Sequence, residues 1–270
     1  MSTNDGHRRF QIFREWVIFL AGHSKWANIK HRKAKVDAQR GRLFTKLGKE
    51  ILVAARRGGD PDANPLLKTA IARAREANMP MDNINRLIAK ATGELEGVNY
   101  EEVTYEGYAA GGVAVLLVTV TDNRNRTAPE LRHLFSRHGG SLGEAGCVAW
   151  MFDRKGLITL SKESLSVDPE ELMLLLIEEG AEDVREEEDS IEVVTAPDDL
   201  DKIKEFLSAQ NIKYSTAEVT MVPNSTISVT DKNTAEKVLN LMDALEDHDD
   251  TQQVYANFDI PDEVLQELGE

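Results

Sequence analysis

Residues 100–121 read YEEVTYEGYAAGGVAVLLVTVT, and here the chain changes from helical to strand periodicity. We expect strands at 103–108 and 113–121, joined by a turn at 109–112 that contains two adjacent glycines. This hairpin separates a helical N-terminal region from a region in which strands and helices follow one another.

Downstream of the hairpin, apolar runs of strand length alternate with helical patterns. One helix is expected after Thr127–Glu130, which has the spacing of a capping box. Further helices are expected at 168–180, 197–209 and 234–247, and strands at 147–152, 156–160, 190–195, 218–222, 225–229 and 253–258. This order predicts an α+β fold with two ferredoxin-like units, each of which needs about 80 residues.

The residues before the hairpin predict a small helical domain with one apolar seam. A helix at 41–57 carries apolar residues at helical spacing, and a glycine pair ends it. Asn64 is placed to cap a second helix, with Pro65 in its first turn. A third helix is expected from Met81 to Gly93.

Charge is strongly segregated along the chain. The whole sequence has a net charge of −15, yet residues 21–90 hold 16 Lys and Arg against 6 Asp and Glu. Residues 91–270 hold 13 against 39. The N-terminal part is therefore expected to meet a polyanion, whereas the acidic remainder is either a solvated surface or a surface for a basic protein.

The basic residues concentrate between 22 and 57, where Asp37 and Glu50 are the only acidic residues. Lysine and arginine bind phosphates, and tryptophan or histidine can stack on a base. A solvated helix face is the alternative for such a run, and a place in the helical core is the alternative for the tryptophan. The residues assigned here to nucleic-acid contact are Lys25, Trp26, Lys30, His31, Arg32, Lys33, Lys35, Arg40, Arg42, Lys46 and Lys49.

The turn at 122–127 is a second candidate for anion binding, since it joins a strand to a helix N-terminus. Free backbone N–H groups and the helix dipole attract anions at such a terminus, and Arg124 and Arg126 add positive charge. These two arginines complete the predicted contact set. Ordinary capping and turn formation by the Asp, Asn and Thr side chains is the alternative.

Sequence patterns for catalysis, cofactors and metals are weak or absent. Gly139–Gly143 matches G-x-S-x-G around Ser141, but a helix precedes it and a strand follows, the reverse of what that motif needs. His133 and His138 diverge around one helix, and the single cysteine, Cys147, excludes a cysteine-based zinc site. We expect no enzyme, no cofactor and no metal, with a serine hydrolase as a remote alternative.

Residues 1–20 are aromatic and carry arginines, unlike the residues that follow. This composition is compatible with a transit peptide or a short signal peptide, although Ala21–His23 makes a poor cleavage site. An upstream extension of the protein is the alternative. No apolar run in the sequence approaches the ~20 residues that cross a bilayer. We expect a cytoplasmic protein without membrane contact.

Four long motifs resemble the YebC/PmpR family in content and in order. They read AGHSKWANIKHRKAKVDAQRGRLFTKLGKEI (21–51), GGDPDANPLLKTAIARAREANMP (58–80), YEGYAAGGVAVLLVTVTDNRNRT (105–127) and GGSLGEAGCVAWMFDRKG (139–156). The resemblance covers about residues 21–270. The family includes the mitochondrial translational activator of cytochrome c oxidase subunit I.

The resemblance implies three domains, with the last helix and strand returning to the middle one. Family members usually begin with Met at the position of Leu20, which implies that residues 1–20 are a non-native extension. The implied domains are a basic helical domain at 21–98, an α+β domain at 99–153 plus 227–270, and an inserted α+β domain at 154–226.

The resemblance also implies a non-enzymatic regulator that binds nucleic acid. Family members are commonly described as DNA-binding transcriptional regulators, and others look like ribosome-associated translation factors that contact ribosomal or transfer RNA. Basic ribosomal proteins are expected partners for the acidic C-terminal domains. The sequence shows no helix-turn-helix with a readable recognition helix, which leans toward the ribosomal alternative.

Overall fold

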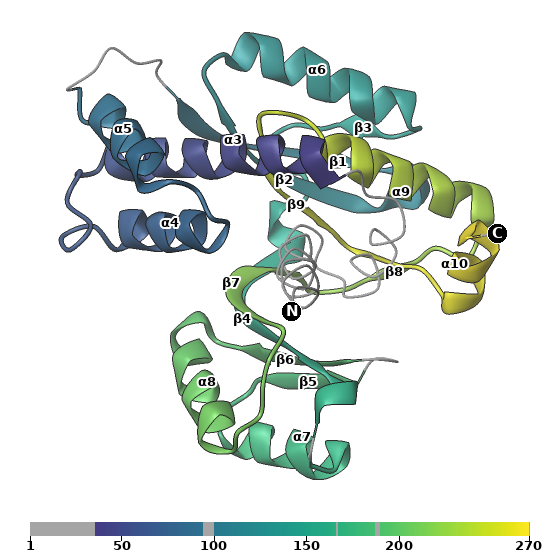
Figure 1. The fold of residues 1–270 in the computed structure, drawn as a ribbon. Helices are drawn as coiled ribbons and strands as arrows, with labels where there is room; N and C mark the ends of the chain where they lie inside the picture. The colour runs from purple at the N-terminus through teal and green to yellow at the C-terminus, as the bar shows by residue number, and fades with distance from the viewer. Residues whose placement is uncertain (1–35, 94–99, 166, 187–189, 270) are drawn as a thin grey trace, which may run out of the picture. The chain divides into compact units, whose positions relative to one another are not determined.

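The structure, a computed structural model, describes residues 36–93, 100–165, 167–186 and 190–269. The described residues form two compact units (Figure 1). One unit runs from residue 150 to 225, and the other comprises the described residues on either side of it. Within the part of the chain that the structure describes, no helix is both long and apolar enough to cross a membrane.

Three helices open the described part of the larger unit (Figure 1). They share one buried apolar cluster. Leu47 and Ile51, one turn apart on the first helix, join Leu67 of the second and Ile84 of the third, and none is more than 4% exposed. The helices are α3 (Val36–Ala55), α4 (Pro65–Glu76) and α5 (Met81–Ala91).

The start of α4 confirms the cap predicted from the sequence. Asn64 Oδ1 accepts a hydrogen bond from the Leu67 N–H at 3.2 Å, and Pro65 is the first helical residue. Asn64 Nδ2 also donates to the carbonyl oxygens of Ala54 and Gly58, both at 2.8 Å. One side chain therefore fixes the end of α3 against the start of α4.

The hairpin at 100–121 forms the centre of a four-stranded sheet. Strands β1 (Glu101–Tyr108) and β2 (Ala114–Thr121) pair antiparallel along their whole length. The turn η2 (Ala110–Gly112) joins them, and Gly111 has a φ of 73°, which suits glycine. The sheet order is β3-β1-β2-β9, with β3 (Ser141–Leu142) and β9 (Thr251–Ala256) at its edges.

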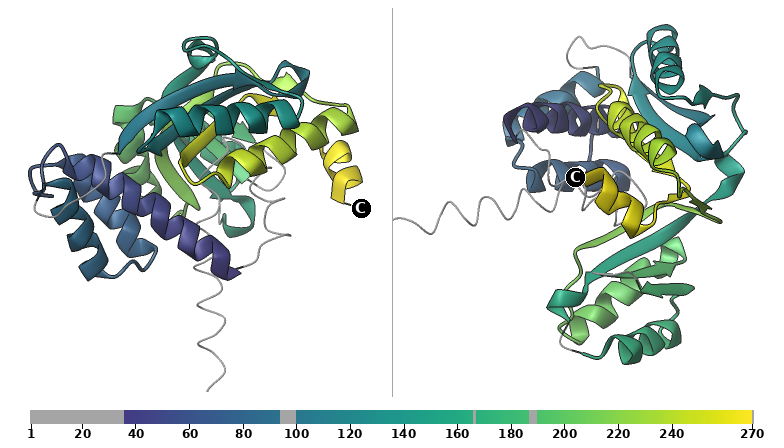
Figure 2. Two further views of the ribbon diagram at one scale, coloured as in Figure 1. Left: turned by 90° about the horizontal axis from the view of Figure 1, so that it is seen from above. Right: turned by 90° about the vertical axis from the view of Figure 1, so that its right-hand side faces the viewer.

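Two helices lie side by side over this sheet (Figure 2). Helix α6 (Arg124–Arg137) buries Phe135, and α9 (Lys232–Glu246) buries Leu241. Gly107 lies under α6, where an added Cβ would come within 2.8 Å of the Phe135 ring. The remaining elements of this unit are β8 (Ile227–Ser228), β10 (Phe258–Asp259), which pairs with it in parallel, and α10 (Asp262–Gly269).

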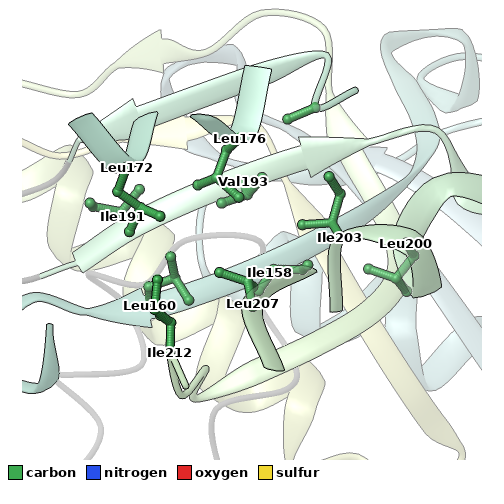
Figure 3. Close-up of a cluster of buried hydrophobic side chains, with 11 residues drawn as sticks. Ile158, Leu160, Leu172, Leu176, Ile191, Val193, Leu200, Ile203, Leu207 and Ile212 are labelled. Carbon is green, nitrogen blue, oxygen red and sulfur yellow. The ribbon is translucent and has the colours of Figure 1, made fainter. Parts of the chain in front are cut away.

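The unit at 150–225 has the β-α-β-β-α-β order of a ferredoxin-like fold. Its antiparallel sheet has the order β5-β6-β4-β7. Figure 3 shows Leu172 and Leu176 of its first helix and Ile203 of its second in one cluster with Ile158 and Ile191 of the sheet. The elements are β4 (Phe152–Ser161), α7 (Pro169–Glu178), β5 (Asp183–Glu186), β6 (Ser190–Thr195), α8 (Leu200–Ala209) and β7 (Thr216–Pro223), with 3-10 turns η3 (Ala149–Met151), η4 (Lys162–Ser164) and η5 (Pro197–Asp199).

These elements confirm the predicted α+β class, in which a helical segment precedes parts that contain sheets. The predicted strand at 147–152 is wrong, because β4 begins only at Phe152. The Glu106 carboxylate accepts backbone hydrogen bonds from Gly146, Val148 and Ala149 at 2.6, 2.7 and 2.8 Å. Those N–H groups turn toward one side chain, so this stretch is a loop.

The predicted capping box at Thr127 is also wrong. Helix α6 begins at Arg124, and its cap is Asn123, whose Oδ1 accepts from the Arg126 N–H at 3.2 Å. Thr127 is fully buried inside the helix. The short strand β5 and the terminal helix α10 had no predicted counterpart.

Candidate nucleic-acid interface

The structure describes part of the basic segment that the sequence assigns to nucleic acid. It places on α3 and on the first turn of α6 the residues Arg40, Arg42, Lys46, Lys49, Arg124 and Arg126. The assigned residues that lie outside the described part of the chain are Lys25, Trp26, Lys30, His31, Arg32, Lys33 and Lys35.

A buried carboxylate, Asp250, joins α3 to α6. Lys49 Nζ donates to Asp250 Oδ1 at 2.7 Å, while Arg126 Nη2 and Thr127 Oγ1 each donate to Oδ2 at 2.7 Å. The side chains of Lys49 and Asp250 are 9% and 3% exposed. Lys49 also donates to the carbonyl oxygen of Asp249 at 2.8 Å. This cluster holds three parts of the chain together.

Burial alone would raise the pKa of Asp250, but hydrogen bonds from Lys49, Thr127 and Arg126 hold that pKa well below its usual range. The carboxylate is therefore charged and keeps its donors. If Lys49 left to bind a phosphate, Asp250 would lose a buried partner, and breaking a buried pair costs about 3–5 kcal/mol. Lys49 thus has structural partners inside the protein, and its contact with nucleic acid stays a prediction.

Lys46 and Arg124 also have partners within the protein. Lys46 Nζ donates to the Glu246 carbonyl oxygen at 2.7 Å, in the last turn of α9. Arg124 forms a two-pronged pair with Glu101 at 2.5 and 2.6 Å, and its side chain is 56% exposed. Exposed pairs contribute little, so Arg124 can exchange Glu101 for a phosphate.

The turn at 122–127 forms the capping hydrogen bonds that were the alternative to an anion site. The backbone N–H groups of Arg126 and Thr127 both donate to Asn123, and the N–H of Asn123 donates to Thr121 Oγ1 at 2.9 Å. The Arg126 side chain also lies 3.0 Å from Asp122. The backbone N–H groups of Asn123, Arg126 and Thr127 are therefore occupied, and the Arg126 side chain is paired with carboxylates.

A groove of about 360 Å³ lies beside this cluster and is bordered by α3 and α5. Phe44, Leu52 and Leu87 give it an apolar lining, to which Tyr100 adds an aromatic ring. Lys49 Nζ lies 5.6 Å from the centre of that ring, within cation–π range. Burial raises the pKa of the Tyr100 phenol, so the ring is uncharged at neutral pH.

Two further cations, Arg86 and Lys90, lie one turn apart on α5 and line the same groove. Both are exposed, and neither forms an ion pair with any residue in the described ranges. Neither residue was predicted from the sequence, because both lie outside the dense basic run at 22–57. Their spacing of four residues on a helix beside an aromatic residue was the available signal.

The residues weighed for catalysis and metal binding occupy ordinary structural positions. Ser141 begins the short strand β3 and pairs with Tyr108 at a sheet edge, not at a strand-to-helix turn. Among the described residues, no group of three or more His, Cys, Asp or Glu side chains is placed to hold a metal ion.

Comparison with known proteins gives matches along most of the chain. The model of the TACO1/YebC protein N-terminal domain matches residues 24–94, and that of the TACO1/YebC second and third domain matches residues 100–258. A crystal structure of a conserved hypothetical protein from Aquifex aeolicus is 53% identical, with a TM-score of 0.74. The match covers 88% of this chain and 98% of the Aquifex aeolicus chain.

Curated relatives have similar length and high identity. A "Probable transcriptional regulatory protein" from Natranaerobius thermophilus is 58% identical over 92% of this chain and 99% of its own length. One of the same description from Carboxydothermus hydrogenoformans is 59% identical over 90% of this chain and 100% of its own length. With both family models and these relatives in agreement, the chain belongs to the TACO1/YebC family.

Proposed function

We propose that this protein is a non-enzymatic regulator that binds nucleic acid through its N-terminal helical part. The observation that carries the proposal is the groove between α3 and α5, where exposed Arg86 and Lys90 flank an apolar and aromatic lining. Phosphate-binding cations beside a ring on which a base can stack are the two components of single-strand recognition.

The surroundings of the groove support the same partner. Together with Arg86 and Lys90 of the groove, the described helical part carries six exposed cations against four exposed carboxylates, those of Asp60, Asp62, Glu76 and Asp82. Long-range attraction to a polyanion depends on such an excess of one charge. The exposed cations outside the groove are Arg56, Arg57, Lys68 and Arg75.

The relatives are described as probable transcriptional regulatory proteins, so the first form of the proposal is transcriptional regulation, with DNA as the bound nucleic acid. The dimensions of the groove favour a second form, a ribosome-associated translation factor that contacts ribosomal or transfer RNA. A space of about 360 Å³ with an apolar lining suits one unstacked base. Proteins read unstacked bases mainly in single-stranded RNA, whereas duplex DNA keeps its bases paired.

The acidic remainder of the chain limits how a long duplex could bind. Residues 91–270 hold 39 acidic side chains against 13 basic ones, and they would repel phosphates outside a small contact area. A short RNA segment or loop meets that restriction more easily than an extended duplex. We further propose a cytoplasmic location, with nucleic acid as the main partner.

Two variants test the groove. Arg86→Glu/Lys90→Glu should weaken binding to a single-stranded RNA 12-mer at about 150 mM salt by tenfold or more, because two phosphate contacts become repulsive. Tyr100→Ala should weaken it by about tenfold to a hundredfold through lost stacking, and Tyr100→Phe should leave it unchanged. Equal binding by all variants and the parent would overturn the groove as the site.

A third variant tests the basic segment, and a matched variant controls for total charge. Lys33→Glu/Arg40→Glu/Arg42→Glu is expected to lose RNA binding, while Arg185→Glu/Lys202→Glu/Lys213→Glu in the acidic unit is expected to keep it. Two assays at about 150 mM salt then distinguish a transcriptional regulator from a ribosome-associated translation factor. They are binding to a promoter-length DNA duplex and co-sedimentation with ribosomes. Stronger binding to a specific duplex than to RNA or ribosomes would favour the transcriptional form.

A further inference from the structure

Helix α7 in the unit at 150–225 is apolar on almost every side. Its sequence is PEELMLLLIE, in which six apolar residues follow one another. Leu172 and Leu176 point into the core of the unit (Figure 3). Such a helix normally lies inside a protein, with other elements on all sides.

The opposite side of α7 nevertheless faces outward. Leu174 is 69% exposed, Ile177 is 48% exposed and Leu175 is 38% exposed. Leu174 and Ile177 are three positions apart and so share one face of the helix. An exposed apolar cluster on a single helix is typical of an interaction surface, whereas single exposed apolar residues are common.

Glutamates border this apolar face. Glu170 and Glu178 lie four positions before and after Leu174, and Glu171 lies three positions before it. All three are exposed. Residues 150–225 as a whole hold 19 Asp and Glu against 7 Lys and Arg. The partner of this face must therefore combine apolar side chains with positive charge.

That charge pattern decides between the candidate occupants. A second copy of the chain would bring its own Glu170, Glu171 and Glu178 against the same residues, and like charges oppose that contact. A nucleic acid would be repelled by the same carboxylates. A basic amphipathic helix satisfies both requirements, because its apolar stripe covers the leucines and its lysines or arginines meet the glutamates.

We propose that the α7 face is a docking surface for a basic amphipathic helix of a protein partner. Leu174 and Ile177 would anchor the partner's apolar stripe, and Glu170, Glu171 and Glu178 would pair with its cations. The surface shares no residue with the α3–α5 groove, so this proposal does not depend on nucleic-acid binding.

The test uses the full chain and an 18-residue synthetic helix of leucine and lysine with a single apolar stripe. Titration into the ¹⁵N-labelled protein should shift the amide signals of α7, and Leu174→Gln/Ile177→Gln should weaken binding at least tenfold. Leu66→Gln, which alters a leucine that is 53% exposed on α4, is the control and should have no effect. Equal binding by the double variant, or shifts that lie elsewhere, would overturn the proposal.

Two further arms define the occupant. Glu170→Lys/Glu171→Lys/Glu178→Lys should reduce binding of the lysine peptide and create binding for the same peptide with glutamate in place of lysine. Residues 1–20 also combine arginines with apolar side chains. If the peptide binds only after residues 1–20 are removed, the chain's own N-terminus is the occupant and a separate partner is contradicted.

Discussion

Lys49 on α3 donates a hydrogen bond of 2.7 Å to Asp250, which lies 201 positions later in the chain next to the start of β9. The same carboxylate accepts from Arg126 and Thr127 on α6. The helical segment is thereby attached to the sheet of the same unit through one buried charge. A basic residue that resembles a phosphate ligand in the sequence is instead part of the protein's interior.

Replacing Asp250 should strongly destabilise the protein. Asp250→Ala leaves Lys49 buried without its counter-charge, and we expect a loss of about 3–5 kcal/mol in the free energy of unfolding. Urea unfolding followed by circular dichroism measures this change. Asp249→Ala, at the exposed neighbouring position, should cost less than about 0.5 kcal/mol. Similar losses in the two variants would contradict the role of the Asp250 cluster.

The Asp250 cluster also predicts how stability depends on pH. Because the folded state lowers the pKa of Asp250 below its ordinary value of 3.8, its contribution is fully present above that value. The contribution is lost as the pH falls below 3.8, because Asp250 is then protonated in the unfolded state while it stays ionised in the folded state. Asp250→Asn should flatten the decline of unfolding free energy between about pH 4 and pH 3. If the free energy of unfolding of the variant declines as steeply as that of the parent, Asp250 is not the cause of the pH dependence.

Glu106 should fix the loop that follows β3. Burial alone would raise its pKa, but the hydrogen bonds from the N–H groups of Gly146, Val148 and Ala149 lower it overall. Glu106→Gln replaces one accepting oxygen with a donor, so we expect a loss of about 2 kcal/mol in the free energy of unfolding. Faster amide hydrogen exchange at those three positions should accompany the loss. Glu101→Gln, at an exposed position on the same strand, is the control and should leave exchange there unchanged.

The two sides of α7 should respond differently to truncation. Leu176→Ala removes a side chain that is fully buried, and we expect a loss of about 2–5 kcal/mol in the free energy of unfolding. Leu174→Ala, two positions earlier and 69% exposed, should change it by less than about 0.5 kcal/mol. A large loss for Leu174→Ala would mean that other parts of the chain cover this face.

Local features of the fold followed from the sequence because their causes are local. The hairpin of β1 and β2 was predicted from strand periodicity around a glycine pair, and the cap at Asn64 from its position before Pro65. The start of α6 was misplaced by four residues because Asn123 and Thr127 are both acceptable caps. Only the folded chain shows that the Thr127 hydroxyl donates its hydrogen bond to Asp250.

The parts that could not be predicted depend on residues far apart in the sequence. The loop at 146–149 is set by Glu106, forty positions earlier, so its apolar sequence suggested a strand. The partner of Lys49 is equally remote, and nothing near Lys49 identifies it as buried. Arg86 and Lys90 were overlooked because charge density along the sequence does not show which cations share a groove with Tyr100.

The salt dependence of RNA binding tests the central proposal most directly. For single strands, the logarithm of affinity falls with the logarithm of salt concentration by about 0.7 for each phosphate contact. For a single-stranded RNA 12-mer between about 50 and 200 mM salt, Arg86→Glu/Lys90→Glu should reduce that slope by about 1.4 and weaken binding throughout. If the parent and the variant have the same affinity and the same slope, the α3–α5 groove is not where this protein binds nucleic acid.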